Sequence, residues 1–375
     1  MRQHGGVRMT ASEALARRMR SLLLVGAPPG AHVAADSVAG VVTWFGAMQA
    51  QDYASGLWSL GARLPAMTRA EIEGALERRE AVRTWPMRGT LHLVPAADAR
   101  WMVGVLGARA LAGAARRRAQ LGLDEATAER AADVLGAALA GGGRLTRAQC
   151  LAVLTEAGIP TDGQRGYHLL GFASQRGVTC MAPNRGTEQT FVLLEEWVGC
   201  SNRPSRDEAL GTIAIRYVRS HGPVPRSDFA GWTGLTAADT AAAVAAAGDA
   251  LATVEVDGAA MLLAADTLAD DPPPLHDTAL ALPGYDEYLL GYRDRTLMVD
   301  PARARAVVLG GGAFRATIVR AGRVIGTWTR SRSTARTIVD VVALDPLRPR
   351  DRRGVEAAFE RYAHFLGSPV EVRWP

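Results

Sequence analysis

Two glutamines, Gln49 and Gln51, stand one residue apart at the end of an apolar run near the N-terminus. In an extended backbone, side chains two positions apart project to the same side, so these two neutral amides could hold one water between them. In a helix the same positions diverge by roughly 200 degrees, so the pair is useful only where the helix stops. The alternative is a helix C-terminus whose amides cap free carbonyl groups.

Three further stretches combine arginines with aromatic or acidic side chains. Residues 83–92 carry arginines, a tryptophan and a histidine; residues 282–295 carry three tyrosines, three acids and two arginines; residues 330–336 form a basic tip after a predicted strand. Each has a structural alternative, namely an ordinary strand, a solvated acid–arginine network and a solvated tip. If the partner is DNA, the predicted contacts to phosphates and groove edges are Arg88, His92, Arg293, Arg295, Arg330 and Arg332.

The composition indicates a globular protein with a basic bias. The chain has 375 residues, of which 48% are hydrophobic and 22% charged, which is typical of folded rather than disordered proteins. All 43 basic side chains are arginines, and the net charge is +5. GC-rich coding bias would explain the arginine excess, but each guanidinium is in any case a permanently charged fork suited to phosphates. The charge mildly favours a polyanionic partner.

Cysteine and histidine spacing argues against a metal or disulfide framework. Cys150, Cys180 and Cys200 are widely separated, and the seven histidines show no paired-ligand spacing, so neither a metal nor another cofactor is expected. Arginines interrupt the N-terminal apolar stretch before it could form a signal sequence, and the alanine-rich stretch 240–248 is too short to span a membrane. We therefore expect a cytoplasmic monomer with no membrane partner, associated with the nucleoid when bound to DNA.

One order of elements recurs three times along the chain: two or three helices followed by two short strands. In the first repeat we predict helices over 12–19 and 37–48, a helix from Thr68 with a capping box to Glu71, and a ribbon over 81–94. The second repeat is predicted as helices over 124–140, 145–158 and 164–176, then strands over 178–181 and 190–194. The third has helices over 207–221 and 236–247 and a hairpin around Asp257-Gly258.

The remaining C-terminal segment is predicted to be mainly strands. After the prolines at 272–274, strands are expected over 304–309, 313–320, 323–330, 338–343 and 370–374, with a helix over 352–366. The predicted fold class is therefore α+β, with three tandem winged-helix domains followed by a small C-terminal β-barrel. The predicted domains are residues 10–100, 120–200, 205–265 and 275–375. Winged helices also serve as dimerisation and scaffold modules, so the pattern alone does not require DNA.

Taken together, these stretches resemble the AlkZ/YcaQ-type winged-helix DNA glycosylase family over nearly the full chain. The resemblance is carried by Met-Gln-Ala-Gln-Asp at 48–52, Trp-Pro-Met-Arg-Gly-Thr-Leu-His at 85–92 and the tyrosine-rich segment 282–295. It implies that Gln49, Ala50 and Gln51 form the catalytic motif. The YcaQ-like branch has an aspartate at the second polar position, so Gln51 implies the AlkZ-like branch, whose members are associated with bulky alkylation products and interstrand crosslinks.

The chemistry of such a pair fits a lesion that is already activated. An N7-alkylated guanine carries a positive charge and leaves as a neutral base, so the amides need only orient a water and stabilise an oxocarbenium-like sugar. The chain has no lysine side chain that could form a Schiff base, which favours a monofunctional glycosylase acting on double-stranded DNA with alkylated purines. The alternatives are a winged-helix transcriptional regulator and a lesion-binding protein without catalysis. General repair and self-resistance to a genotoxic natural product both remain open.

Overall fold

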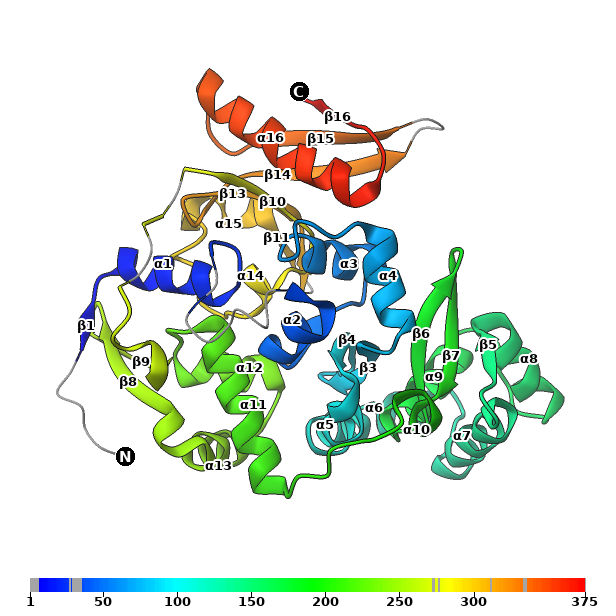
Figure 1. The fold of residues 1–375 in the computed structure, drawn as a ribbon. Helices are drawn as coiled ribbons and strands as arrows, with labels where there is room; N and C mark the ends of the chain where they lie inside the picture. The colour runs from blue at the N-terminus through cyan, green and yellow to red at the C-terminus, as the bar shows by residue number, and fades with distance from the viewer. Residues whose placement is uncertain are drawn as a thin grey trace.

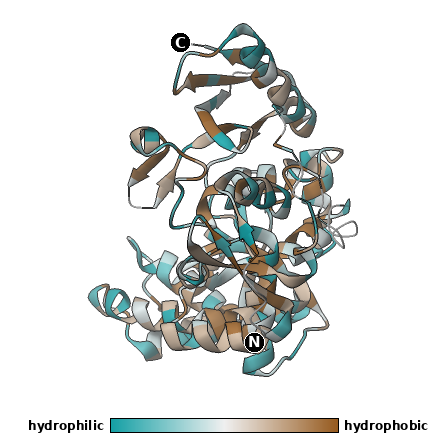
Figure 2. Ribbon diagram, turned by 90° about the vertical axis from the view of Figure 1, so that its left-hand side faces the viewer, coloured by the Kyte–Doolittle hydropathy of each residue, from teal (hydrophilic) through white to brown (hydrophobic). Residues whose placement is uncertain are grey.

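The computed structural model describes residues 7–26, 28, 36–271, 274–275, 277–310, 312–332 and 336–374. Pro272 and Pro273 of the predicted linker lie outside the described residues. The fold is a mixed α+β architecture in which the C-terminal sheet lies above an arc of mostly helical units (Figure 1). Hydrophobic residues concentrate on the central strands, and the turns are more hydrophilic (Figure 2).

Three segments share the order helix, strand, helix, helix, strand, strand. In the first two, the short first strand pairs with the last strand of the following hairpin; in the third, this strand is reduced to a bridge between Val224 and Leu262. The first comprises α2 (Val38–Phe45), β2 (Met48–Gln49), α3 (Tyr53–Gly61), α4 (Arg69–Glu77), β3 (Ala81–Met87) and β4 (Thr90–Pro95). The second comprises α7 (Glu125–Leu139), β5 (Arg144–Thr146), α8 (Arg147–Glu156), α9 (Arg165–Gln175), β6 (Thr179–Arg185) and β7 (Glu188–Leu193). The third comprises α11 (Arg206–His221), α12 (Arg226–Thr233), α13 (Ala237–Ala247), β8 (Leu251–Val256) and β9 (Ala259–Ala264).

The first two segments share one sheet, whereas the third has its own. The strand order β2-β4-β3-β6-β7-β5 joins them through a pairing of Arg83 on β3 with Met181 on β6. On β8, the third segment's sheet gains a short parallel strand from near the N-terminus. Elements outside the repeats complete this region: β1 (Arg8–Met9), α1 (Ala11–Ser21), α5 (Ala99–Leu106), α6 (Ala108–Gln120) and α10 (Leu194–Val198).

The C-terminal part is a curled sheet that forms half a barrel, where the sequence predicted a small β-barrel. Its strands have the order β10-β13-β14-β15-β16. Among the described residues, β10 and β16 form the two edges, and neither pairs with a further strand on its outer side. A long helix, α16, packs against both of these edge strands. The elements are β10 (Ala279–Leu282), α14 (Glu287–Leu290), α15 (Ala304–Val307), β11 (Val308–Gly310), β12 (Ala313–Phe314), β13 (Ala316–Arg320), β14 (Arg323–Arg332), β15 (Thr337–Ala343), α16 (Pro349–Leu366) and β16 (Val370–Arg373).

Two kinds of error in the predicted elements have simple causes. The strand predicted over 304–309 begins as helix α15, because Asp300 caps a turn with Pro301 at its first position and that turn continues into the helix. Helix α3 was not predicted, because six consecutive residues from Gly56 to Gly61 are buried and no polar face reveals a helical period. α5, α6, α12 and α14 were also missed.

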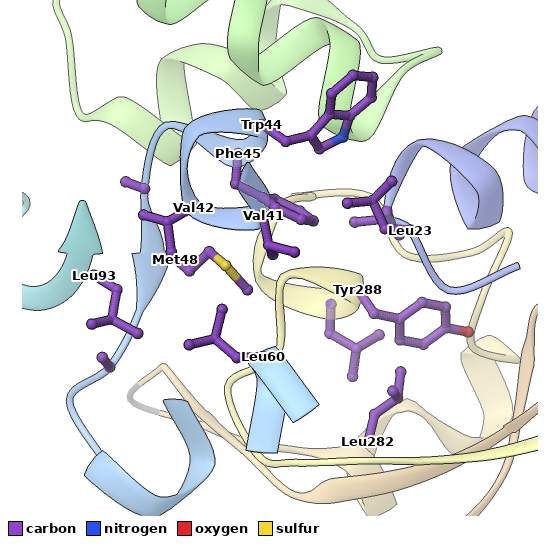
Figure 3. Packing of buried hydrophobic residues seen from close by; sticks show 14 of the residues in the cluster. Leu23, Val41, Val42, Trp44, Phe45, Met48, Leu60, Leu93, Leu282 and Tyr288 are labelled. Atoms are coloured by element: carbon purple, nitrogen blue, oxygen red, sulfur yellow. The ribbon is translucent and has the colours of Figure 1, made fainter. Parts of the chain in front are cut away.

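One hydrophobic core connects the first segment, the third segment and the C-terminal sheet, whereas the second segment has mostly its own core. Figure 3 shows how side chains from distant parts of the chain meet there. Phe45 and Met48 precede the glutamine pair, and Leu60 lies in α3; Leu282 and Tyr288 come from the C-terminal segment. The segment that holds the glutamines is therefore packed directly against residues 282–288.

Candidate active site

Gln49 lies in extended backbone shortly after a helix, and Gln51 lies in the bend that follows. Helix α2 ends at Phe45, with Gly46 at a φ of 78°, and Gln49 then pairs with His92 across β2 and β4. The N–H of Ala50 continues this pairing to the carbonyl of Leu91 at 2.9 Å. Because the side chain of Ala50 is buried, the alternating direction of an extended chain turns the glutamines on either side of it away from the core. The alternative, in which the two amides cap the end of that helix, is not what the structure has.

A close contact holds this extended segment against α3. A Cβ at Gly56 would lie 2.9 Å from the Cβ of Ala50, so glycine is needed where the helix crosses the segment. Asp52 caps α3 by accepting the N–H of Ser55 at 2.6 Å, which makes the helix begin directly after Gln51. The order strand, glutamine pair and capped helix leaves little freedom in the backbone of the pair.

The two amides have different surroundings. Gln51 is exposed, and its Oε1 accepts the N–H of Leu91 at 3.0 Å, which orients the amide. Gln49 is half-buried, and its Oε1 is buried without a hydrogen-bond partner among the described residues. An unmade hydrogen bond of this kind costs about 1–3 kcal/mol, so such an acceptor marks a position where a water or ligand would bind.

A buried carboxylate stands directly behind Gln49. The Oε1 of Glu287, the first residue of α14, accepts the backbone N–H of Gln49 at 2.9 Å. Its Oε2 accepts Trp232 Nε1 at 2.9 Å and lies 3.4 Å from His221 Nε2. Burial alone would raise the pKa of Glu287, but these hydrogen bonds and the attraction of His221 lower it to about 2. Glu287 is therefore an ionised group although it is only 1% exposed.

His221 is enclosed by aromatic rings that hold it in place against this carboxylate. Tyr217 stacks on it with ring centroids 4.5 Å apart, and Phe45 meets it edge-on at 5.6 Å. A Cβ at Gly291 would overlap the His221 ring, so α14 can pack here only with glycine at its end. The other ring nitrogen, Nδ1, lies 3.1 Å from the Tyr217 carbonyl, which can only accept. Ser220 Oγ lies 2.8 Å from the same nitrogen, so contacts at both ring nitrogens fix the orientation of the ring against Glu287.

A buried ion pair between an aspartate and an arginine fixes the helix that carries Glu287. Asp286 caps α14 through the N–H of Tyr288 and receives two hydrogen bonds from Arg63, at 2.8 and 2.9 Å. Ser59 Oγ donates to the same carboxylate at 2.6 Å. Ser59 belongs to α3, so its hydrogen bond to Asp286 links the helix after the glutamines to the helix that supplies the carboxylate.

Arg88 and His92 lie in the same hairpin as the partner strand of Gln49. Arg88 and Gly89 have φ values of 54° and 70° and form the two-residue turn between β3 and β4. Burial and the neighbouring Arg88 lower the pKa of His92 to about 3, so the ring is neutral. Its Nδ1 donates to the Thr90 carbonyl at 2.9 Å, and its Nε2 accepts from Arg88 Nη2 at 3.2 Å. His92 is fully buried, which favours Arg88 over His92 for any direct contact with DNA.

The other predicted contact residues are spread over the C-terminal part. Arg293 is exposed and follows the glutamate helix, and its backbone N–H donates to Asp228 at 3.2 Å. Arg295 donates to the Leu289 and Arg293 carbonyls and lies over the Phe314 ring. Arg330 is exposed on β14 and donates to Tyr362 Oη at 3.0 Å. Arg332 ends the same strand, and its side chain lies outside the described part of the structure.

Sequence reasoning missed three residues of this network, Glu287, His221 and Trp232. Glu287 stood in the acid-rich segment 282–295, whose two arginines were selected instead. A signal was available, because two adjacent acids at 286–287 inside an apolar context are expected to be paired if buried. His221 and Trp232 showed no comparable pattern.

The described residues contain neither a metal-binding cluster nor a membrane-spanning helix. No group of three or more histidine, cysteine, aspartate or glutamate side chains there is placed to hold a metal ion. None of the helices within that part of the chain is long and apolar enough to cross a bilayer.

Comparison with known proteins adds three findings. The family described as "DNA glycosylase AlkZ-like" matches residues 42–365. An "Interstrand DNA cross-link repair glycosylase" of Streptomyces sahachiroi is 27% identical over 349 residues, covering 88% of this chain and 90% of the relative. The structure of the Streptomyces sahachiroi DNA glycosylase AlkZ matches with a TM-score of 0.79 at 23% identity, covering 98% of this chain and all of that one. The last likeness shows a shared fold.

Proposed function

The chain belongs to the AlkZ-like DNA glycosylase family, and we propose that it hydrolyses the N-glycosidic bond of N7-alkylated guanine in double-stranded DNA, with Gln49 and Gln51 as the catalytic residues. The observation that carries this proposal is the buried, unpartnered Oε1 of Gln49 beside the oriented amide of Gln51. Gln49 ends the short strand β2 and Gln51 lies in the bend that follows, and the backbone between them is held by the Leu91 carbonyl and by Glu287. Pre-organised acceptors of this kind are what a water nucleophile and a sugar cation require.

The chemistry assigned to each group follows from its surroundings. The free carbonyl oxygen of Gln49 accepts a hydrogen bond from the attacking water, whose proton passes to solvent once the bond to the sugar has formed, and directs partial negative charge towards the sugar as it becomes cationic. Gln51 supports the same water, with its amide held in place by Leu91. A cationic N7-alkylguanine departs as a neutral base, so a monofunctional hydrolysis needs no strong general acid. We propose bulky adducts and interstrand crosslinks as the substrate class, in line with the name of the Streptomyces relative.

We further propose that the three repeated segments are winged-helix domains, with bounds near 10–100, 120–200 and 205–265, which serve as a DNA-binding framework and not as readers of base sequence. The third helix of the first segment, α4, carries Glu71, Glu73 and Glu77 and packs against β6. The corresponding helix of the third segment, α13, exposes only small apolar side chains over most of its outer face: Ala237, Ala238, Ala241, Ala242, Ala245 and Ala246. The acidic side chains of α4 would repel DNA phosphates and the alanines of α13 offer no hydrogen-bonding groups to base edges, which disfavours the regulator hypothesis for these two segments.

The decisive measurement is release of the modified base by the wild-type protein. Duplexes would carry one N7-methylguanine, one bulky N7 adduct or one N7–N7 interstrand crosslink, with protein-free incubations to correct for spontaneous depurination. Release of the free base with an abasic site left behind supports the proposal, and the preferred duplex identifies the substrate class. A discrete footprint on undamaged DNA without release would support a regulator instead. Tight binding to modified duplex without release would support a lesion-binding protein.

Replacing Arg293 by alanine is expected to weaken binding to lesion DNA and to flatten its salt dependence. The side chain is exposed and rests on Gly231, and the network that holds Glu287 does not use its guanidinium. Losing one phosphate contact should lower the slope of log affinity against log salt by about 1. Arg8→Ala is the control, because that side chain is 82% exposed on β1 and pairs with Glu255. An unchanged slope for Arg293→Ala would remove this residue from the DNA interface.

A further inference from the structure

The site that holds two neutral glutamine amides also contains a charge from a distant part of the chain. Glu287 is 238 residues from Gln49 in sequence, yet its Oε1 accepts the Gln49 backbone N–H at 2.9 Å. The other oxygen faces Trp232 and His221, and both of these side chains are buried as well. The carboxylate is thus held on both of its oxygens by groups from three other elements.

We propose that Glu287 is a positioning residue for the glycosylase reaction. It fixes the backbone of Gln49, and it places a permanent negative charge behind Gln49, facing the position where the sugar cation would form. This inference rests on the proposed function. Both polar positions of the motif, 49 and 51, are neutral amides in this chain. Glu287 then supplies the anionic character of the site from behind the strand instead of from within the motif.

The orientation of the carboxylate supports this role. Oε1 of Glu287 points to the Gln49 backbone, whereas His221 and Trp232 both lie next to Oε2, so the oxygen that faces Gln49 has neither of these side chains as a partner. The other titratable groups that act on Glu287 are Arg88 and His92 from the first hairpin, Tyr217 from α11 and Tyr292 after α14. His92 is neutral, and a DNA phosphate bound by Arg88 would neutralise that cation. The carboxylate then remains as the charge that a nearby oxocarbenium ion senses.

A merely structural carboxylate would explain the hydrogen bonds but not a need for ionisation. A neutral amide at position 287 would still offer an oxygen to the Gln49 N–H, so an isosteric replacement separates the two roles. If only the backbone contact matters, Glu287→Gln should keep most of the excision rate. If the charge matters, the rate should fall while lesion binding is retained, because the charge acts on the transition state more than on the bound ground state.

The test is single-turnover excision of N7-methylguanine by wild-type protein, Glu287→Gln and Asp351→Asn. We expect Glu287→Gln to slow excision about 10- to 100-fold, the size expected for one unit charge about 6–12 Å from a developing charge at an effective dielectric constant near 20. Its affinity for lesion DNA should stay within about 3-fold. Asp351 is the control. Like Glu287 it is a buried acid, but it is paired with an arginine and lies at the start of α16.

The outcomes separate the two proposals. A wild-type protein that releases no base overturns the proposed function and this inference with it. A wild-type protein that excises, together with a Glu287→Gln variant that excises equally well, overturns only the inference. A thermal melt of each variant, with excision measured well below every melting temperature, removes loss of folded protein as the cause of a slower rate.

A second variant keeps the inference testable if Glu287→Gln does not fold. His221→Gln removes the partner that contributes most to keeping Glu287 ionised, and burial then raises the pKa of Glu287 from about 2. Excision by this variant should begin to fall at a higher pH than excision by the wild-type protein, because its carboxylate becomes protonated at a higher pH, and it should recover when the pH is raised again. Identical pH profiles for the two proteins would contradict the role of the charge.

Discussion

Replacing Gln49 by alanine is expected to reduce the single-turnover rate of N7-alkylguanine excision about 100-fold or more, since it removes a pre-organised acceptor at the reacting centre. The lost oxygen is the buried one that has no partner among the described residues, so its removal leaves no stranded group and the fold should tolerate it. Binding to lesion DNA should change much less than the rate, because the interaction is formed mainly in the transition state.

Gln51→Ala is expected to have a smaller effect on rate than Gln49→Ala. Its Oε1 already accepts the Leu91 N–H, and water can replace that acceptor at an exposed position. The two variants and their combination would be compared with Gln175→Ala, a half-buried glutamine at the end of α9 in the second segment. Because both amides act on one water, the double variant should lose little more than Gln49→Ala. Undiminished excision by the double variant would disprove the catalytic assignment.

Replacing Arg63 by alanine is expected to destabilise the protein by about 3–5 kcal/mol, the usual effect of removing one partner of a buried ion pair. The Arg63 side chain is fully buried, and that of Asp286 is 3% exposed. The variant would leave the Asp286 carboxylate with Ser59 and the Tyr288 N–H as its remaining donors. The free energy of unfolding, measured by urea titration, gives the size of the effect.

The matched control is a partly exposed ion pair that also joins an arginine to an acid. Arg69 and Glu73 form an i,i+4 pair whose side chains are each about one-third exposed. Arg69→Ala should cost less than about 1 kcal/mol, because solvent screens such pairs. Equal effects of Arg63→Ala and Arg69→Ala would mean that the Arg63–Asp286 pair does not hold α14 against α3. In that case the position of Glu287 would depend on its own contacts alone.

Much of the local structure was predictable because it depends on neighbouring residues. The capping box of Thr68 with Glu71 starts α4 as predicted, and Ser37 caps α2. The turn Asp257-Gly258 joins β8 and β9 with φ values of 47° and 83°. Such features are encoded within four or five residues, so no tertiary contact is needed to recognise them. The missed helices α3 and α14 also begin at capping aspartates, but they are largely buried, so no polar face shows a helical period.

The C-terminal sheet shows a different limit. Its strands β13, β14, β15 and β16 were predicted from their pattern, but whether their sheet closes depends on which edges meet. β10, which forms one edge, was not predicted, and α16 packs against both edges of the sheet. Closure into a barrel is a property of strand register and tilt over the whole sheet, which alternating hydrophobicity does not encode.

For the candidate site, the sequence by itself determined the glutamine pair, its place just beyond a helix and its resemblance to a glycosylase motif, because these are properties of consecutive residues. It also determined that position 51 is an amide and not a carboxylate. Only the tertiary structure decided that the site is charged. Glu287, His221 and Trp232 lie on three different elements, and burial and hydrogen bonding at their meeting point set the ionisation of Glu287. A pKa is governed by desolvation and by neighbouring charges in space, which the order of residues along the chain does not reveal.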